Sequence, residues 1–333
     1  MSRGDRAQTG VRPFDPFRDP KQVTDLIAVA FGDRLGPDGE VMLAEMRRVA
    51  RWNHWSPLQG LLYRPRWSMA GLAQGFVWVE QGRVVGNVSL RRALGWGGFF
   101  IGNVAVHPDR QGQGIAGALM EAALEAISEQ GGHWVGLEVR ADNEVARRLY
   151  EHLGFRDVGE TLHMLRPAGL PWTGNPPSHP SLRRGCSRDS AALIELVCAV
   201  APAPQRPLLE LRKEDYRPSW GRALDRWLEG RREAWWVVEE DGVIRGAVRT
   251  LHERGRRPDR MEVLMSPGVH LETLLVQRGV AGLRTAHKKM IETILPNPGE
   301  SLVAALEAVG FQKLRVLVQM RLDLAQPISV RDY

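Results

Sequence analysis

The chain is poor in cysteine, with only Cys186 and Cys198 among its 333 residues. One pair in so long a chain excludes a disulfide framework and predicts free thiols in a reducing cytoplasm. The chain also lacks any run of about 18 apolar residues, the length that a membrane-spanning helix needs. Its first residues show no apolar segment typical of a secretory signal. These absences predict a cytoplasmic protein without a membrane partner.

Patterns typical of metal and nucleic-acid sites are absent as well. The nine histidines include no pair spaced four residues apart, and no Cys-x-x-Cys motif accompanies them, so we expect no metal cofactor. The net charge of +6 comes almost wholly from scattered arginines, since the chain has five lysines and no basic block interleaved with aromatic residues. This distribution argues against nucleic acid as a partner. A mildly basic surface still favours an anionic cofactor.

The length of the chain and one segment of unusual composition indicate two domains. A chain of 333 residues exceeds the usual size of a single domain. Residues 168–180 are rich in proline and glycine and show no periodicity, which is typical of a linker. We therefore predict domains at residues 1–167 and 181–333.

The two halves share sequence patterns. Residues 76–89 have the pattern of a β-hairpin with its turn at Gln81-Gly82, and residues 235–248 repeat this pattern. A Gly-Phe pair at 154–155 recurs at 310–311, at nearly the same offset. These repeats predict an internal duplication, for which chance similarity is the alternative.

Residues 104–120 carry the strongest functional pattern. A short apolar run ends at Pro108, a turn with Gly112 and Gly114 follows, and a helix is predicted from Ile115 to the Gly131-Gly132 pair. The apolar residues expected to form its buried face are Ile115, Ala118, Leu119, Ala122 and Ala126. A glycine-rich turn before a helix presents free N–H groups to a phosphate. The spacing fits neither a dinucleotide-binding fingerprint nor a P-loop, so an ordinary connection is the alternative.

The segment Val-x-Val-His-Pro followed by Gln111-x-x-Gly114-x-Ala116 resembles motif A of the GNAT superfamily of N-acetyltransferases. Residues 137–155 resemble the second half of the family's site, with a strand, an asparagine, a helix containing Leu-Tyr, and Gly-Phe. The resemblance implies an α+β fold of two tandem GNAT-like domains, each with a mixed, mostly antiparallel sheet flanked by helices. It also implies that acetyl-CoA is the cosubstrate of acetyl transfer to a primary amine by direct attack in a ternary complex.

The resemblance assigns contacts for the cosubstrate as well. It implies that the pyrophosphate meets the motif that contains Gln111, Gly112, Gln113, Gly114, Ile115 and Ala116. The strand residues Val104, Ala105 and Val106 would expose backbone groups to the pantetheine arm and polarise the thioester carbonyl. Asn143 matches an asparagine that contacts the cofactor arm, and an N-cap of the following helix is its alternative role.

Two residues are candidates for proton transfer. Tyr150 matches the family's Leu-Tyr position and is the predicted acid for the departing thiolate; a core aromatic is its alternative role. Glu138 is the predicted base, because a carboxylate in an otherwise apolar strand is costly to bury unless it has a task. The string Leu-Glu-Val-Arg around it resembles the ribosomal-protein alanine acetyltransferases. A solvent-facing strand residue, with a water relay as base, is the alternative.

The second copy is predicted to lack this chemistry. It has a single glycine, Gly268, in place of the Gln-Gly-Gln-Gly turn, and Ala305-Leu306 in place of Leu-Tyr. We expect one CoA site per chain, with the second domain serving as scaffold, lid or homodimer surface.

The acceptor is predicted less sharply, as a small-molecule amine or a peptide N-terminus. The resemblance implies that the acceptor cleft is formed by two helices between about Gln22 and Ala50 and by the aromatic-rich segments 51–57 and 61–67. An acyltransferase for a longer acyl-CoA and a non-catalytic acyl-CoA sensor are the alternatives. The presence of both Glu138 and Tyr150 argues against the sensor.

Overall fold

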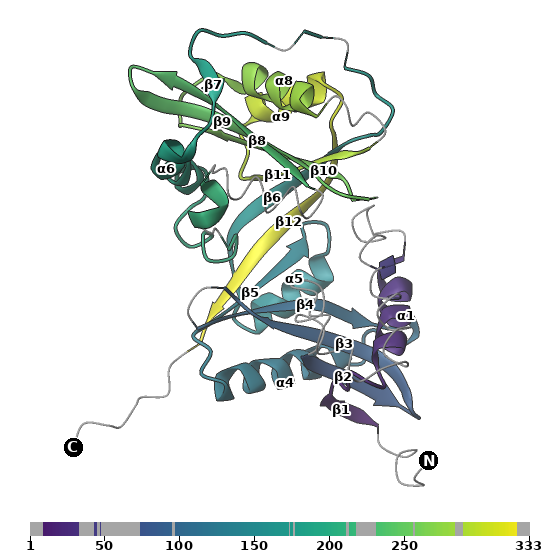
Figure 1. Cartoon of the computed structure of the whole chain (residues 1–333). Helices are drawn as coiled ribbons and strands as arrows, with labels where there is room; N and C mark the ends of the chain where they lie inside the picture. Colours follow the sequence, from purple (N-terminus) through teal and green to yellow (C-terminus); the bar gives the residue numbers. More distant parts are fainter. Residues whose placement is uncertain are drawn as a thin grey trace, which may run out of the picture. The chain divides into compact units, whose positions relative to one another are not determined.

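The structure of the chain is a computed structural model (Figure 1). It describes residues 9–32, 43–44, 47, 74–94, 97–172, 174–175, 177–210, 213–217, 231–255, 257–283 and 289–324. The chain divides into two compact units. Unit 1 contains residues 1–138, 145–156 and 320–333, and unit 2 contains residues 139–144 and 157–319.

The sheet of unit 1 is built on the predicted hairpin. Strands β2 (Gly75–Glu80) and β3 (Arg83–Arg92) pair antiparallel. Gln81 and Gly82 connect them with φ angles of 49° and 79°, and two left-handed residues in succession match the twist of a tight hairpin. Strand β1 (Gly10–Pro13) pairs antiparallel with β2, and β4 (Gly98–Val106) pairs antiparallel with β3. Strand β5 (Trp134–Arg140) pairs parallel with β4.

Helices cover both faces of this sheet. Helix α1 (Pro20–Phe31) packs Val23, Leu26 and Ile27 against a face that includes Val77 and Ala105; we call it the α1 face. Helix α4 (Ile115–Glu129) covers the opposite face (Figure 1). Successive residues of a strand point to opposite faces, and Gly86 of β3 points away from the α1 face. A Cβ at Gly86 would lie 2.8 Å from the Ile115 side chain of α4.

The predicted start and end of α4 are confirmed, but its predicted buried face is wrong in part. Ile115 and Leu119 are buried as expected, whereas Ala118, Ala122 and Ala126 are only half-buried. Besides these two, the helix buries the larger side chains of Met120 and Ile127, together with Ala123. The small alanines fit the predicted period, but the larger apolar side chains gain more from burial.

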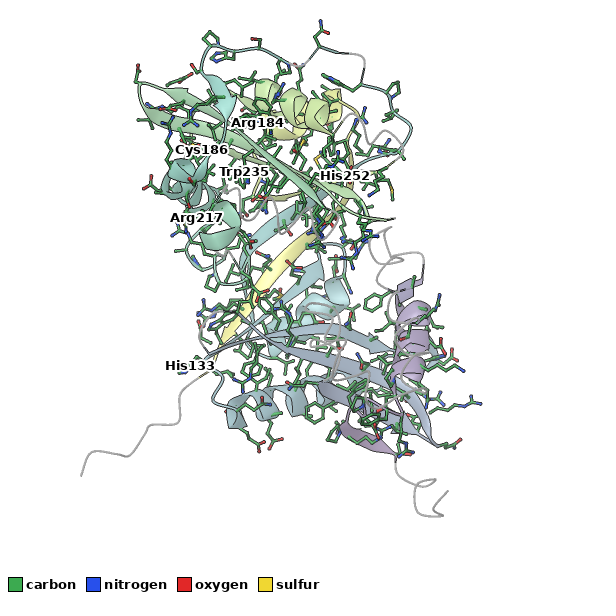
Figure 2. The ribbon with its side chains drawn as sticks, in the orientation of Figure 1. His133, Arg184, Cys186, Arg217, Trp235 and His252 are labelled. Carbon is green, nitrogen blue, oxygen red and sulfur yellow. The ribbon has the colours of Figure 1, made fainter. Side chains whose placement is uncertain are left out.

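Unit 2 repeats the elements of unit 1 in the same order. Strand β7 (Leu182–Arg184) and helix α6 (Ser190–Val200) are followed by the antiparallel strands β8 (Arg232–Glu240), β9 (Val243–His252) and β10 (Asp259–Met265). Helix α8 (Glu272–Gly282), the strand β11 (Ile291–Pro296), parallel to β10, and helix α9 (Glu300–Ala308) complete the repeat. Trp235, labelled in Figure 2, packs with side chains of α6. The predicted duplication and the α+β class are confirmed.

Each repeat ends in a long strand after a helix and a Gly-Phe turn. Helix α5 (Glu144–His152) precedes β6 (Arg156–Arg166), and α9 precedes β12 (Gln312–Asp323). Gly154 and Gly310 between them have φ angles of 91° and 93°, a conformation that glycine adopts readily.

The last strands are exchanged between the compact units. Almost all of β6 belongs to unit 2, where it pairs antiparallel with β11. The end of β12, from Met320, belongs to unit 1. There the N–H of Leu324 donates to the carbonyl of His133 (2.9 Å). Figure 2 labels His133. The predicted domains 1–167 and 181–333 describe the repeats of the sequence and remain a prediction. No helix among the described residues is long and apolar enough to cross a membrane.

Candidate functional site

In unit 1, strand β4 separates from its parallel neighbour β5. The two strands pair from Gly98–Trp134 to Phe100–Gly136, and β4 then continues to Val106 while β5 continues to Arg140. Backbone groups that point from a central strand toward such an opening have no ladder partner, and they need a ligand or water.

A β-bulge lies on β4 just beyond the point of separation. Asn87 on β3 faces Ala105 and Ser89 faces Gly102, so Asn103 and Val104 together lie opposite one residue of β3. Asn103 has a φ of 50°, in the left-handed region. The side-chain nitrogen of Asn87 donates to the Asn103 carbonyl (2.9 Å).

The bulge sets which backbone groups of β4 face the opening. The N–H of His107 donates to the carbonyl of Val85 on β3 (2.8 Å). Because alternate residues of a strand direct their backbone groups to the same neighbour, the N–H and C=O of Ala105, two residues earlier, also point to β3. Val104 and Val106 therefore present their N–H and C=O groups to the side of β5. Of the three predicted strand residues, these two offer backbone groups to a ligand and Ala105 does not.

The glycine-rich turn continues directly from this strand. After the 3₁₀ turn Pro108–Arg110, Gly112 and Gly114 have φ angles of 74° and 78°, and a Cβ on either would meet no atom within 4 Å. The N–H groups of Gly112, Gln113 and Gly114 have no acceptor among the described residues. The first turn of α4 adds the free N–H groups of Ile115 and Ala116, and it contains no acidic residue. This turn fits a diphosphate.

The N–H of Gln111 is not free for the pyrophosphate as predicted, because it donates to the carbonyl of Pro108 (3.3 Å). The side chain of Gln111 instead donates to the carbonyl of Val106 (3.3 Å), which ties the turn to the end of β4. A second tie is the ion pair between Arg110 and Glu80 on β2 (2.7 Å). The hydrogen bond from Arg110 holds the pKa of the Glu80 carboxyl below its usual value.

Glu138 lies on the α1 face of the sheet. Gly136 pairs with Phe100, and Glu138 and Gly102 each lie two residues further along, so both share that face. The side chain of Glu138 is exposed, so the argument from the cost of burial is wrong; its role as base remains a prediction. Gly102 is also exposed, although it lies on a central strand, and a Cβ there would meet no atom within 4 Å. The α1 face is therefore open beside the bulge.

Tyr150 is buried in α5, with 6% of its surface exposed. Burial raises the pKa of its phenol to about 12. The hydroxyl makes no hydrogen bond within the part of the chain that the structure describes, and it is not among the fully buried polar atoms that lack a partner. Tyr150 is therefore a neutral phenol whose oxygen is not sealed off. Asn143 directly precedes α5, and its N–H donates to the carbonyl of Arg140 (3.0 Å).

The predicted acceptor elements are described only in part. Helix α1 is present as expected, but residues 51–57 and 61–67, and most of the second predicted helix, lie outside the described residues. Within the described ranges, no three His, Cys, Asp or Glu side chains are placed to hold a metal ion.

The same region of unit 2 has a different chemistry. Leu306 occupies the place of Tyr150, since Phe311 donates to its carbonyl (3.0 Å) as Phe155 does to that of Tyr150 (3.0 Å). At the start of α8 lies a carboxylate, Glu272, which accepts a hydrogen bond from Ser301 of α9 (2.7 Å). This contact links the starts of both helices and places a negative charge where a diphosphate would lie.

Comparison with known proteins identifies the first repeat. The family model for the Acetyltransferase (GNAT) family matches residues 43–155. Over 56 residues the chain is 46% identical to [ribosomal protein bS18]-alanine N-acetyltransferase of Escherichia coli K12, covering 17% of this chain and 38% of that protein. Over 145 residues it is 31% identical to mycothiol acetyltransferase of Actinosynnema mirum, covering 44% and 43%. The chain thus spans less than half the length of these two relatives.

Solved structures resemble the chain over nearly its whole length. A tandem GNAT protein from the clavulanic acid biosynthesis pathway has 18% identity and a TM-score of 0.58, covering 95% of this chain and 98% of its own. A GCN5-related N-acetyltransferase from Sphaerobacter thermophilus has 17% identity and a TM-score of 0.61, covering 97% of each chain. At these identities the likeness shows the fold alone, which is that of a tandem GNAT protein.

Substitution of Gly112 by Asp tests the glycine-rich turn. The new carboxylate repels a diphosphate and the side chain strains the positive φ, so we expect the affinity for CoA to fall by about tenfold or more, which corresponds to about 1.4 kcal/mol. Gly268→Asp is the matched control, because Gly268 has a φ of 77° and equally open surroundings in the second repeat. The affinity is measured by calorimetry. If the folded Gly112→Asp variant binds CoA with wild-type affinity, the glycine-rich turn is not the diphosphate site.

The binding stoichiometry tests the difference between the repeats. We expect one CoA per chain, because Glu272 and Ser301 occupy the start of α8 whereas the start of α4 carries no carboxylate. Isothermal titration of the full chain measures this number directly. Two equivalent sites per chain would contradict the expectation.

Proposed function

We propose, from the membership of residues 43–155 in the Acetyltransferase (GNAT) family, that this chain moves an acetyl group from acetyl-CoA to a primary amine. The observation that carries the proposal is the separation of β4 from β5, which leaves the backbone groups of Val104 and the N–H of Val106 without a ladder partner. The free N–H groups of the glycine-rich turn follow directly in the chain. A strand edge that accepts and donates hydrogen bonds, next to an anion site, suits a pantetheine arm that ends in a diphosphate.

The residues present fit acetyl-CoA, which supplies the activated acetyl thioester. Val104 and Val106 would bind the amides of its arm, and the N–H groups from Gly112 to Ala116 would bind its diphosphate. A backbone N–H near the bulge would also stabilise negative charge that develops on the thioester oxygen. No acidic residue in the first turn of α4 opposes the diphosphate.

Tyr150 acts in this proposal as the acid. Because burial raises its pKa to about 12, the phenol stays protonated throughout the neutral range and holds a proton for the departing thiolate. Its ring is held against that of Phe155, with centroids 6.1 Å apart. Since its hydroxyl makes no hydrogen bond to the described residues, no bond has to be broken first.

Glu138 acts as the base, either directly or through a water molecule. Its position on the α1 face, beside the open space at Gly102, supports a role toward an acceptor that enters from that face.

The acceptor is proposed to be a small-molecule amine or a peptide N-terminus. The names of two relatives support one class each, since one is named for the alanine of a ribosomal protein and the other for mycothiol, a small molecule. The decisive experiment incubates the chain with acetyl-CoA and a panel of small amines and peptides, and it measures CoA release. Release with free peptides or amines, and none with their N-acetylated counterparts, is expected. CoA binding without release on any amine would favour the non-catalytic sensor.

The substitution Tyr150→Phe removes one hydroxyl. We expect kcat to fall about 10²–10⁴-fold, as for a lost proton donor, while CoA affinity and the thermal unfolding temperature stay near those of the wild type. Because the phenol titrates near pH 12, it should cause no loss of wild-type kcat between about pH 7 and 10. Unchanged kcat in the variant would exclude Tyr150 as the acid.

The substitution Glu138→Gln removes the proposed base. A carboxylate base must be ionised, so wild-type activity should decrease as the pH falls through its titration, and this acidic limb should be lost in the variant. Glu125→Gln, which alters an exposed carboxylate of α4, is the matched control. An acidic limb that persists in Glu138→Gln would assign the base to another group.

The substitution Gly102→Leu fills the open space on the α1 face. Gly102 has no positive φ and its Cβ direction is free, so the variant should fold. We expect KM for the acceptor amine to rise about tenfold, or about 1.4 kcal/mol, with CoA affinity unchanged. Steady-state kinetics at saturating acetyl-CoA provide the test, and Gly102→Ala serves as the milder control; equal KM values in all three proteins would place the acceptor elsewhere.

A further inference from the structure

We infer that Asn87 is a positioning residue that maintains the bulge of β4 and so directs the amides of Val104 and Val106 toward the pantetheine arm. The inference rests on the proposed function. It assigns to a buried side chain of β3, outside the glycine-rich turn and helix α4, the task of setting the geometry of the cosubstrate site.

Asn87 is a polar residue in an apolar layer. It is 1% exposed, and it shares its face of the sheet with Val77 and Ala105. Burial of an amide is costly unless the group is hydrogen-bonded. Its nitrogen donates to the Asn103 carbonyl (2.9 Å) and to the Ser89 hydroxyl (3.3 Å). The amide therefore bonds to the bulge itself.

The orientation of the Asn87 amide follows from its partner. The carbonyl of Asn103 can only accept a hydrogen bond, so the atom that faces it is the nitrogen. Asn103 in turn holds a φ of 50°, in the left-handed region, which asparagine adopts more readily than most residues with a side chain. The Asn87 bond thus fixes the carbonyl of this residue of β4, and Ser89 accepts a second bond from the Asn103 side chain (3.5 Å).

Loss of the bulge would change which groups face the opening. Alternate residues of a strand direct their N–H and C=O groups to opposite neighbours, and the extra residue at Asn103–Val104 shifts this alternation by one. In a regular strand that kept the pairing of Gly102 with Ser89, the groups of Val104 and Val106 would turn toward β3. Those of Ala105 would then face the opening.

The second repeat is a natural comparison. Ser266 donates to Arg245 on β9 (2.9 Å) as His107 does to Val85, so Ala247 takes the place of Asn87. There β9 and β10 pair without any shift of register from Arg260–Leu251 to Met265–Gly246. The repeat that has alanine at this position has a regular strand, and the repeat that has asparagine has the bulge.

The test compares two ligands on the full chain. CoA has the pantetheine arm, whereas 3′-phosphoadenosine 5′-diphosphate keeps the diphosphate and lacks the arm. In Asn87→Ala, which copies the residue of the second repeat, we expect the affinity for CoA to fall about tenfold or more and the affinity for the nucleotide to stay within about twofold of wild type. Thr250→Ala is the control, because it removes a buried hydrogen-bonding side chain from a strand of the second repeat, and it should bind both ligands as the wild type does.

A second variant covers the case in which Asn87→Ala does not fold. Asn103→Val keeps the buried amide but disfavours the positive φ, and it should weaken CoA binding with the same selectivity. Unchanged CoA affinity in the folded variants, or an equal loss for both ligands, would overturn the role of Asn87 while the proposed function stands. A wild-type chain that binds neither ligand would refute the proposed function, and the inference about Asn87 with it.

Discussion

The structure of unit 1 depends on one constraint, which is that a central strand must satisfy its backbone polar groups on both edges. Strand β4 does so on the side of β3 along its length, but on the side of β5 only as far as Phe100. The fold thereby keeps a row of amide groups unpaired in the middle of a sheet, where an orphaned group is costly. The adjoining turn leaves further N–H groups free. Both sets of groups gain partners when one extended, anionic ligand lies along them.

The two repeats share one architecture but differ in the polar groups of the proposed site. Both keep the hairpin turn, the parallel fourth and fifth strands and the Gly-Phe turn. They differ in a few side chains, namely an alanine for Asn87, a carboxylate at the start of the helix and Leu306 for Tyr150. Leu306 is fully buried, so the place of the phenol has become part of the core. Packing is retained where these polar groups differ, because the core of each unit requires apolar side chains and not particular polar ones.

The sequence predicted those features that depend on local chemistry. Gln81-Gly82 and Asp241-Gly242 determine tight turns by themselves, and Gly112 and Gly114 take the positive φ values that the turn needs. The sequence left the exposure of Glu138 open as an alternative, because no local pattern marks the point at which β4 separates from β5. The bulge at Asn103 was missed as well; the only signal was a buried-strand pattern interrupted by Asn87, Ser89 and Asn103. The acceptor segments 51–57 and 61–67 lie outside the described residues.

The exchange of the last strands has a consequence for synthesis of the protein. Unit 1 includes residues from Met320 onward, and these are synthesised after nearly all of the second repeat. Until then β5 lacks its neighbour β12, and an uncovered strand edge readily pairs with another chain. The first repeat therefore cannot complete its fold during translation of its own sequence, as an autonomous N-terminal domain does. Formation of the site in the first repeat is thereby coupled to completion of the second repeat.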